Sequence, residues 1–179
     1  MTRVGPRDTP EAGLSAADHV MGRLDARFTL VEYGDYACPA CIQAEPLVRQ
    51  LVDTEGHRLR FVFRHYPLME LHPQAELAAE AAEAAAAQGK FWPMHHLLFA
   101  QKQHLDAEAL AGYAEAAGLD MLRYRGEMND RIYTQRVQEH RRAGDRSGVH
   151  ATPTFFLNDT LVDVSLGLEK LTEALRAAF

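Results

Sequence analysis

Residues 35–41 read Asp35-Tyr36-Ala37-Cys38-Pro39-Ala40-Cys41, and they contain both cysteines of this 179-residue chain. An apolar segment typical of a β-strand, 28–33, precedes this stretch, and a helical pattern over 42–51 follows it. Two cysteines that are separated by two residues at the start of a helix can form and break a disulfide bond. The stretch therefore predicts thiol–disulfide chemistry.

We expect Cys38 at the N-terminal cap of this helix and Pro39 in its first turn. Proline suits that position because its φ is already helical and the N–H that it lacks would be unpaired. The free N–H groups of the first turn and the helix dipole favour the thiolate of Cys38. Because the thiolate attacks disulfides, we predict Cys38 as the nucleophile and Cys41, almost one turn further on and buried, as the resolving cysteine.

Two other interpretations of the cysteine pair stay open, namely half of a zinc site and two buried cysteines without chemistry. A tetrahedral zinc site needs two more ligands, and the chain has no second cysteine pair. Glu32 lies in the strand-like segment, six positions before Cys38. A carboxylate among apolar neighbours is costly without a function or a partner. We predict that Glu32 relays a proton to or from Cys41, the alternative being an exposed carboxylate on an edge strand.

The composition, with 47% hydrophobic and 25% charged residues, is that of one ordinary globular domain. A net charge of −6 and the lack of basic runs argue against a nucleic-acid partner. No apolar stretch approaches the roughly 18 residues of a membrane span, so we expect no membrane partner. The first residues contain no apolar signal segment, which predicts a cytoplasmic protein, or a periplasmic or exported one if the true N-terminus lies upstream.

The pattern along the chain predicts four parts. They are a flexible lead over 1–17, an α/β part over 18–65, an all-helical insertion over 66–148 and a second α/β part over 149–179. Alternation predicts a strand over 58–64, and strand, helix and strand in this order imply a parallel pair. Inside the insertion, helices are expected over 73–88 and 90–103, after Asp106 and Asp120, and over 131–142.

The last part of the chain predicts a hairpin and a closing helix. Strand character returns over 149–157, the Asn158-Asp159 pair indicates a turn, and 160–164 reads as the return strand. The closing helix is expected over 168–178. Residues 18–27 are ambiguous and fit either a turn or an edge segment.

Four strings in the sequence resemble those of a known family: Val31-Glu-Tyr-Gly-Asp-Tyr-Ala-Cys-Pro-Ala-Cys41, Phe63-Arg-His-Tyr-Pro-Leu68, Gln88-Gly-Lys-Phe-Trp92 and Thr152-Pro-Thr-Phe-Phe156. With the order of elements, they make the chain from about Asp18 onward resemble the DsbA-like form of the thioredoxin fold. The resemblance implies an α/β fold with a central mixed sheet, flanking helices and an all-helical insertion. It also implies that Glu32 is the buried acid of this fold.

The resemblance further implies a cis peptide bond between Thr152 and Pro153, beside the cysteine pair. Proline has no N–H, so the loop can approach Cys38 closely, and the Thr152 backbone can pair with a substrate peptide as an added strand. We therefore expect Thr152 and Pro153, with Pro39 and Ala40, to shape a substrate site.

The chain departs from the family between its cysteines. Strongly oxidising members carry Pro-His there, whereas this chain carries Pro39-Ala40, which implies a less acidic Cys38 and a less oxidising disulfide. His150 lies close to the Thr152 loop, where it either substitutes in part for the missing histidine and contacts substrate, or is a solvated loop residue.

The nine histidines do not predict a metal site. His95 and His96 are adjacent on a helix and about 100° apart, so we expect them to face different ways. His65 follows a strand and is expected to be structural or to pack near the cysteines. We therefore expect neither a metal nor a cofactor.

These patterns together predict a protein disulfide oxidoreductase. It would exchange disulfides with protein or small-molecule thiols and with a redox partner that the sequence does not identify. The alternatives are a glutathione-using transferase or isomerase of the same superfamily, a non-catalytic binding module, and a metal-bridged scaffold.

Overall fold

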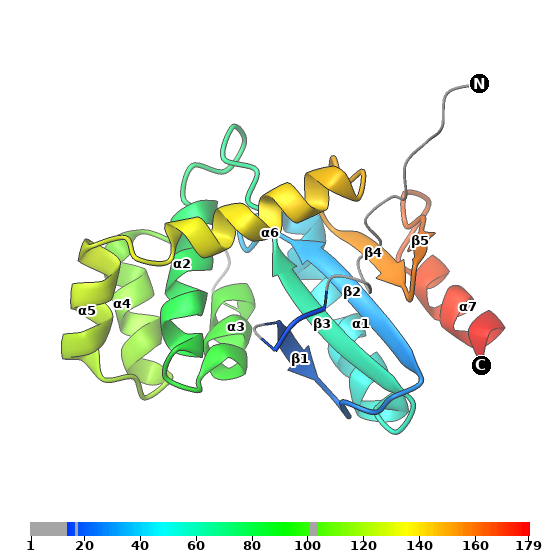
Figure 1. The fold of residues 1–179 in the computed structure, drawn as a ribbon. Helices are drawn as coiled ribbons and strands as arrows, with labels where there is room; N and C mark the ends of the chain where they lie inside the picture. Colours follow the sequence, from blue (N-terminus) through cyan, green and yellow to red (C-terminus); the bar gives the residue numbers. More distant parts are fainter. Residues whose placement is uncertain (1–13, 17, 101–103) are drawn as a thin grey trace.

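The computed structural model describes residues 14–16, 18–100 and 104–179. Its centre is a five-stranded sheet in the order β1-β3-β2-β4-β5 (Figure 1). The strands are β1 (His19–Met21), β2 (Phe28–Gly34), β3 (Leu59–His65), β4 (Thr154–Leu157) and β5 (Thr160–Val162). β2 and β3 are parallel and the other neighbouring pairs are antiparallel. This mixed sheet confirms the predicted thioredoxin fold class.

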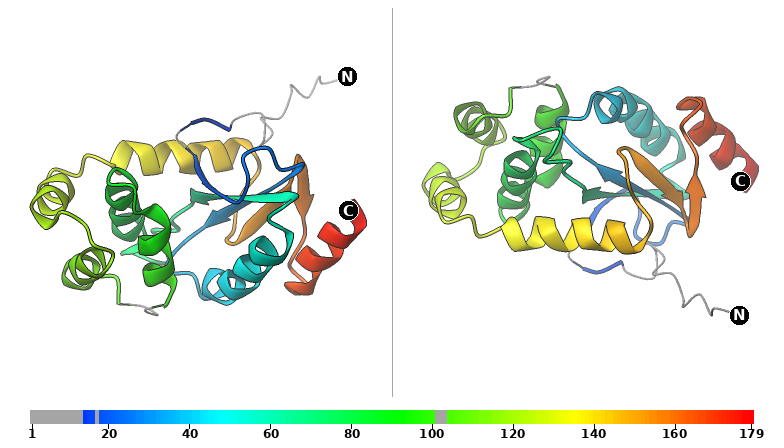
Figure 2. Two further views of the ribbon diagram at one scale, coloured as in Figure 1. Left: turned by 90° about the horizontal axis from the view of Figure 1, so that it is seen from below. Right: turned by 90° about the horizontal axis from the view of Figure 1, so that it is seen from above.

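Seven helices accompany the sheet in the described part of the chain. α1 and α7 cover one face of the sheet, α6 runs across the other, and α2 to α5 lie beside the sheet (Figures 1 and 2). The helices are α1 (Pro39–Glu55), α2 (Ala75–Ala86), α3 (Phe91–Ala100), α4 (Ala107–Ala116), α5 (Met121–Asn129), α6 (Thr134–Arg146) and α7 (Glu169–Ala178). The predicted flexible lead over 1–17 lies largely outside the described residues.

β2 is buried along its whole length because both of its faces are covered. Leu30 belongs to the large apolar cluster shared with α1, whereas Val31 and Tyr33 belong to a smaller cluster on the opposite face. Burying an apolar side chain of this size stabilises the fold by roughly 1.5–3 kcal/mol. The alternation places Glu32, between Leu30 and Tyr33, on the face that carries the cysteine helix.

The structure differs from the sequence pattern at three boundaries. The pattern predicts a helix from residue 131, but α6 begins at Thr134 because Arg131 adopts a left-handed φ of 52°. Arg131 donates to both carboxylate oxygens of Glu80 from this turn, at 2.7 and 2.6 Å. β4 begins at Thr154 and not at 149, since 149–153 form the loop that approaches the cysteines. The ambiguous segment 18–27 contains the edge strand β1.

Two helical glycines should respond in opposite ways to alanine. A Cβ at Gly144 in α6 would lie 2.7 Å from the Tyr66 ring, whereas a Cβ at Gly126 in α5 meets nothing within 4 Å. We expect Gly144→Ala to lower the free energy of unfolding by about 1–3 kcal/mol through overpacking. Gly126→Ala should raise it by about 0.5–1 kcal/mol, because alanine loses less backbone entropy. Urea unfolding measures both, and equal shifts of the same sign would contradict the packing of α6 against the sheet.

Candidate active site

Cys38 is the N-cap residue of α1, with φ −76° and ψ 120°, and Pro39 occupies the first turn. The Cys38 pKa is lowered to about 5, first by a hydrogen bond from the Cys41 thiol. Burial acts in the opposite direction, but the Thr152 side chain and the amides of Cys41 and Ala40 add to the lowering. Cys38 therefore carries a thiolate near neutral pH, and the first turn of α1 holds that charge as the sequence predicts.

Cys41 has the opposite environment. Its side chain is fully buried, and burial raises its pKa well above the ordinary thiol value. The hydrogen bond to Cys38 and the negative charge of Glu32 raise the Cys41 pKa further. The two sulfurs thus differ sharply in acidity although they lie in one turn of helix.

Glu32 is 2% exposed and lies on the central strand β2, so the interpretation as an exposed edge-strand carboxylate is wrong. Burial raises its pKa well above the ordinary carboxyl value, and the charges of Glu45 and Cys38 raise it further. With this raised pKa, the Glu32 carboxyl binds a proton more readily than an ordinary carboxyl does.

The loop before β4 reaches the cysteine pair from the other end of the chain. The Thr152–Pro153 peptide bond is cis, and the Cys38 thiol lies 3.4 Å from the Thr152 carbonyl oxygen. Oγ1 of Thr152 is buried and has no hydrogen-bond partner in the described part of the chain. A thiolate cannot donate to the carbonyl, so the hydroxyl of Thr152 is the donor available to the charged sulfur.

Cys38 is itself only 7% exposed, but some of its neighbours are more accessible. Pro39 and Ala40 are exposed on one side, and Thr152 and Pro153 are half-buried on the other. His150 is exposed at the start of this loop, an environment that matches a solvated residue. The structure thus places Thr152 of the predicted substrate site next to Cys38, which Pro39 and Ala40 follow directly in the chain.

Asp35 organises the turn before Cys38, and the sequence analysis missed it. Its buried carboxylate accepts hydrogen bonds from the amides of Ala37 at 2.7 Å and Leu68 at 2.9 Å, and it lies 2.8 Å from Nδ1 of His72. It therefore joins the cysteine loop to the loop after β3. An aspartate directly after a strand, with its own turn two residues on, is a recognisable Asx-turn signal.

A chain of hydrogen bonds leads away from Tyr36, next to the cysteines. Its hydroxyl lies 2.9 Å from Nδ1 of His95, and Nε2 of His95 lies 3.3 Å from Oε2 of Glu45. His96 reaches the other oxygen of Glu45 at 2.9 Å. His95 and His96, which we expected to face different ways, both reach Glu45 because one carboxylate offers an oxygen to each ring. Burial opposes ionisation of Glu45, but the two histidines outweigh it and lower the Glu45 pKa to about 2.

The family follows from a comparison with known proteins. A family model described as thioredoxin matches residues 14–177. The chain belongs to the thioredoxin family. Its described part contains no helix that is long and apolar enough to cross a membrane.

Solved structures place this thioredoxin-family chain among DsbA-like folds. Oxidised BdbD from Bacillus subtilis is similar with a TM-score of 0.80 and 21% identity, over 89% of this chain and 91% of that one. A thioredoxin-like oxidoreductase from Silicibacter pomeroyi has a TM-score of 0.80 and 29% identity, over 92% and 93%. The thiol-disulfide exchange protein alpha-DsbA2 from Wolbachia pipientis has a TM-score of 0.80 and 20% identity, over 92% and 89%.

Curated relatives match by sequence over most of the chain. A protein named Na⁺/H⁺ antiporter NhaA 1 from Salinispora arenicola is 48% identical over 162 residues, which are 90% of this chain and 25% of that protein. NhaA from Herminiimonas arsenicoxydans is 38% identical over 90% of this chain and 25% of its own length. This thioredoxin-family chain thus spans about a quarter of the length of the curated relatives that it matches.

The effect of the Thr152 hydroxyl should be measurable as a change in the pKa of Cys38. In the reduced protein, thiolate ultraviolet absorbance should rise with a midpoint near pH 5. Thr152→Val removes the hydroxyl that can donate to the charged sulfur, an interaction of roughly 1.5–3 kcal/mol, and should move this midpoint upward. Thr154→Val is the matched control, since its hydroxyl bonds to the Ala151 carbonyl and should leave the midpoint in place. Equal midpoints in all three proteins would show that the hydroxyl does not stabilise the thiolate.

Proposed function

We propose that this chain is a thiol–disulfide oxidoreductase that uses Cys38 and Cys41. The observation that supports it best is the contrast between the two sulfurs. The pKa of Cys38 is lowered to about 5, whereas burial raises the pKa of Cys41 well above that of an ordinary thiol. Two-step exchange needs an ionised attacking sulfur and a second sulfur that stays protonated until the mixed disulfide has formed.

The reaction has two displacements at sulfur. The Cys38 thiolate attacks one sulfur of a substrate disulfide, which forms a mixed disulfide and releases one substrate thiolate. Cys41 then gives its proton to Glu32 and attacks the Cys38 sulfur, which releases the second substrate thiolate to take up a proton. The substrate gains two electrons and the cysteine pair becomes a disulfide. The same steps in reverse oxidise a substrate dithiol.

Substrate would bind where Pro39 and Ala40 face Thr152 and Pro153 across the Cys38 sulfur. The backbone of Thr152 precedes β4 and can pair with an extended peptide as an added strand, which suits protein thiols and disulfides. Small-molecule thiols can reach the same sulfur, because Pro39 and Ala40 are exposed. A second, physiological redox partner would restore the cysteine pair to its starting state.

The curated relatives carry the name of a sodium–proton antiporter, but they are about four times as long as this chain. We propose that the matched quarter is a thiol-redox module of those proteins. The proposal rests on the cysteine geometry of this segment, and no antiport is proposed for it.

Replacing each cysteine tests the two-step scheme. Cys38→Ser should abolish disulfide exchange with a model disulfide peptide, because serine supplies no thiolate. Cys41→Ser should retain the first attack and accumulate mixed disulfides that mass spectrometry detects. Ala107→Ser, an exposed change at the start of α4, is the control and should behave as wild type. Turnover that persists in Cys38→Ser rules out this nucleophile, and a Cys41→Ser protein that traps no substrate rules out the resolving role.

Glu32→Gln tests the proton relay. It keeps the shape of the buried side chain but cannot accept the proton of Cys41. We expect the first attack to proceed at close to the wild-type rate and resolution of the mixed disulfide to slow by ~10²-fold at neutral pH, the lower range of general base catalysis. Raising the pH should recover part of the rate. Rapid acid quenching followed by mass spectrometry separates the two steps, with Glu55→Gln at the end of α1 as control. Unchanged resolution in Glu32→Gln would refute the relay.

A further inference from the structure

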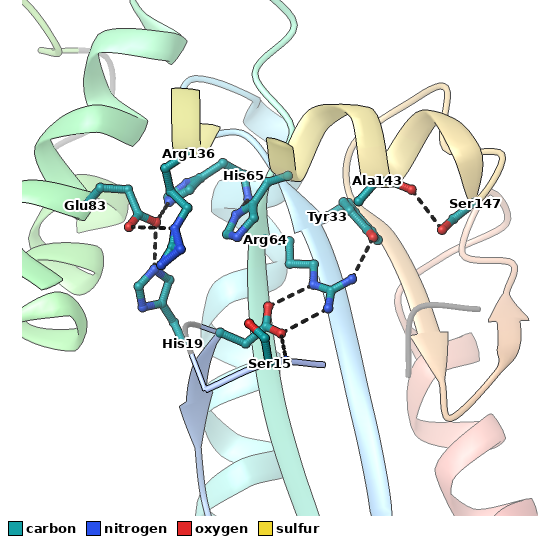
Figure 3. Close-up of polar contacts among 11 residues, drawn as sticks. Ser15, His19, Tyr33, Arg64, His65, Glu83, Arg136, Ala143 and Ser147 are labelled. Atoms are coloured by element: carbon teal, nitrogen blue, oxygen red, sulfur yellow. Dashed lines mark hydrogen bonds and ion pairs between the residues drawn. The ribbon is translucent and has the colours of Figure 1, made fainter. Parts of the chain in front are cut away.

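A second group of titratable side chains lies where the sheet meets the helical insertion. His19 comes from β1, His65 from the end of β3 and Glu83 from α2. Nε2 of His19 lies 2.6 Å from Oε1 of Glu83, and Nε2 of His65 lies 2.8 Å from the same oxygen. Figure 3 shows both rings pointing at this carboxylate from different elements. We call this group the His19 cluster.

The His19 cluster is buried. Exposed fractions of the side chains are 9% for His19, 1% for His65 and 4% for Glu83. A plain hydrogen-bond network at such depth would be expected to satisfy all its polar atoms. Nδ1 of His65, however, is buried and has no hydrogen-bond partner in the described residues. Nδ1 is not the nitrogen that faces Glu83, since Nε2 occupies that position.

The two oxygens of Glu83 have different surroundings. Arg136 lies 3.8 Å from Oε2, the other oxygen of Glu83. Oε1 is thus the oxygen directed at the two imidazoles.

The geometry is close to that of a three-ligand centre. One ligand atom from each of the three residues lies within 4.8 Å of the others. Zinc bonds of about 2.0–2.1 Å in a tetrahedral site hold ligand atoms about 3.3 Å apart. From the present distances of 2.6 and 2.8 Å, the nitrogens of His19 and His65 would therefore need to move away from Oε1 by about 0.7 and about 0.5 Å.

The His19 cluster also has an entrance. A pocket of about 540 Å³ is lined by His19 and Glu83, with Arg136 and Tyr133 on the side of α6. An ion could enter from this pocket, and a water molecule or a small anion could occupy the fourth position on that side. Three protein ligands with an open fourth position form a pattern typical of accessible zinc sites.

We propose that His19, His65 and Glu83 bind a divalent transition-metal ion, and that Zn²⁺ fits them best. Two imidazoles and one carboxylate are the donors that such ions prefer, whereas calcium and magnesium require mostly oxygen ligands. This proposal departs from the sequence expectation of no metal. It does not depend on the proposed thiol chemistry.

A second group, Glu45 with His95 and His96, also places one ligand atom each within 4.8 Å. It fits a metal less well because both ring nitrogens of His95 are engaged, Nδ1 with the Tyr36 hydroxyl and Nε2 with Glu45. This group therefore serves as the internal comparison for the experiment.

The test is a titration of metal-free protein with Co²⁺ and then Zn²⁺. It uses the Cys38→Ser/Cys41→Ser protein, so that thiolates cannot bind the metal. We expect Co²⁺ to bind in a one-to-one ratio with the visible absorption bands of a low-symmetry four-coordinate ion, and Zn²⁺ to displace it. His19→Gln and Glu83→Gln should each weaken binding at least 10-fold, in line with the loss of a ligand or its immediate partner. His96→Gln should bind as the parent does.

Circular dichroism checks that each variant is folded. If one is not, nuclear magnetic resonance of the imidazole nitrogens in the parent protein decides the matter, with Zn²⁺ expected to shift the signals of His19 and His65. No saturable binding, shifts confined to His95 and His96, or loss of binding in His96→Gln alone would each overturn the proposal.

Discussion

The contact on which the active site depends joins the start of α1 to the loop before β4, at the Cys38 sulfur. Amides of the first helical turn approach the sulfur on one side, and Thr152 approaches it from the other, with its carbonyl oxygen 3.4 Å away. A thiolate in this position replaces water with fixed donors, so its charge costs little and its pKa is lowered. The same turn of helix buries Cys41, which keeps the partner sulfur protonated.

The central strand β2 makes this contact possible. It pairs with β3 on one side and with β4 on the other, so it fixes where α1 begins and where the Thr152 loop ends. It also carries Glu32 onto the face that α1 covers, beneath the cysteines. One strand therefore sets the positions of Cys38, Glu32 and the Thr152 loop relative to one another. Its apolar neighbours, such as Leu30 and Val31, hold it in the core from both faces.

Carboxylates that contact two histidines recur around this core. Glu45 lies between His95 and His96, and Glu83 lies between His19 and His65. An ionised carboxylate is costly to bury, and two imidazole donors offset that cost. The Glu45 group is linked to the cysteine region through Tyr36. The charge of Glu45 raises the pKa of Glu32. The Glu83 group lies at the junction of sheet and insertion, where it joins β1 and β3 to α2.

The cysteine pair, the helix that starts at Pro39 and the strands around it could be predicted from the sequence, because their signals are local. Spacing places Cys38 at a helix cap, and alternation places Glu32 on the face of Leu30. Boundaries near Arg131 and Val149 could not be predicted, since a left-handed turn and an approaching loop depend on residues far along the chain. The role of Asp35 was missed for a related reason, because one of its partners is the amide of Leu68.

By itself, the sequence determined the class of fold and the place of both sulfurs in the first turn of a helix, because cap, spacing and hydrophobic period are properties of neighbouring residues. Only the tertiary structure decided which distant side chains meet. His19 and Glu83 are 64 positions apart, yet they share a hydrogen bond of 2.6 Å, because β1 pairs with β3 while α2 packs beside the sheet. Such encounters follow from the path of the whole chain, which no local pattern encodes.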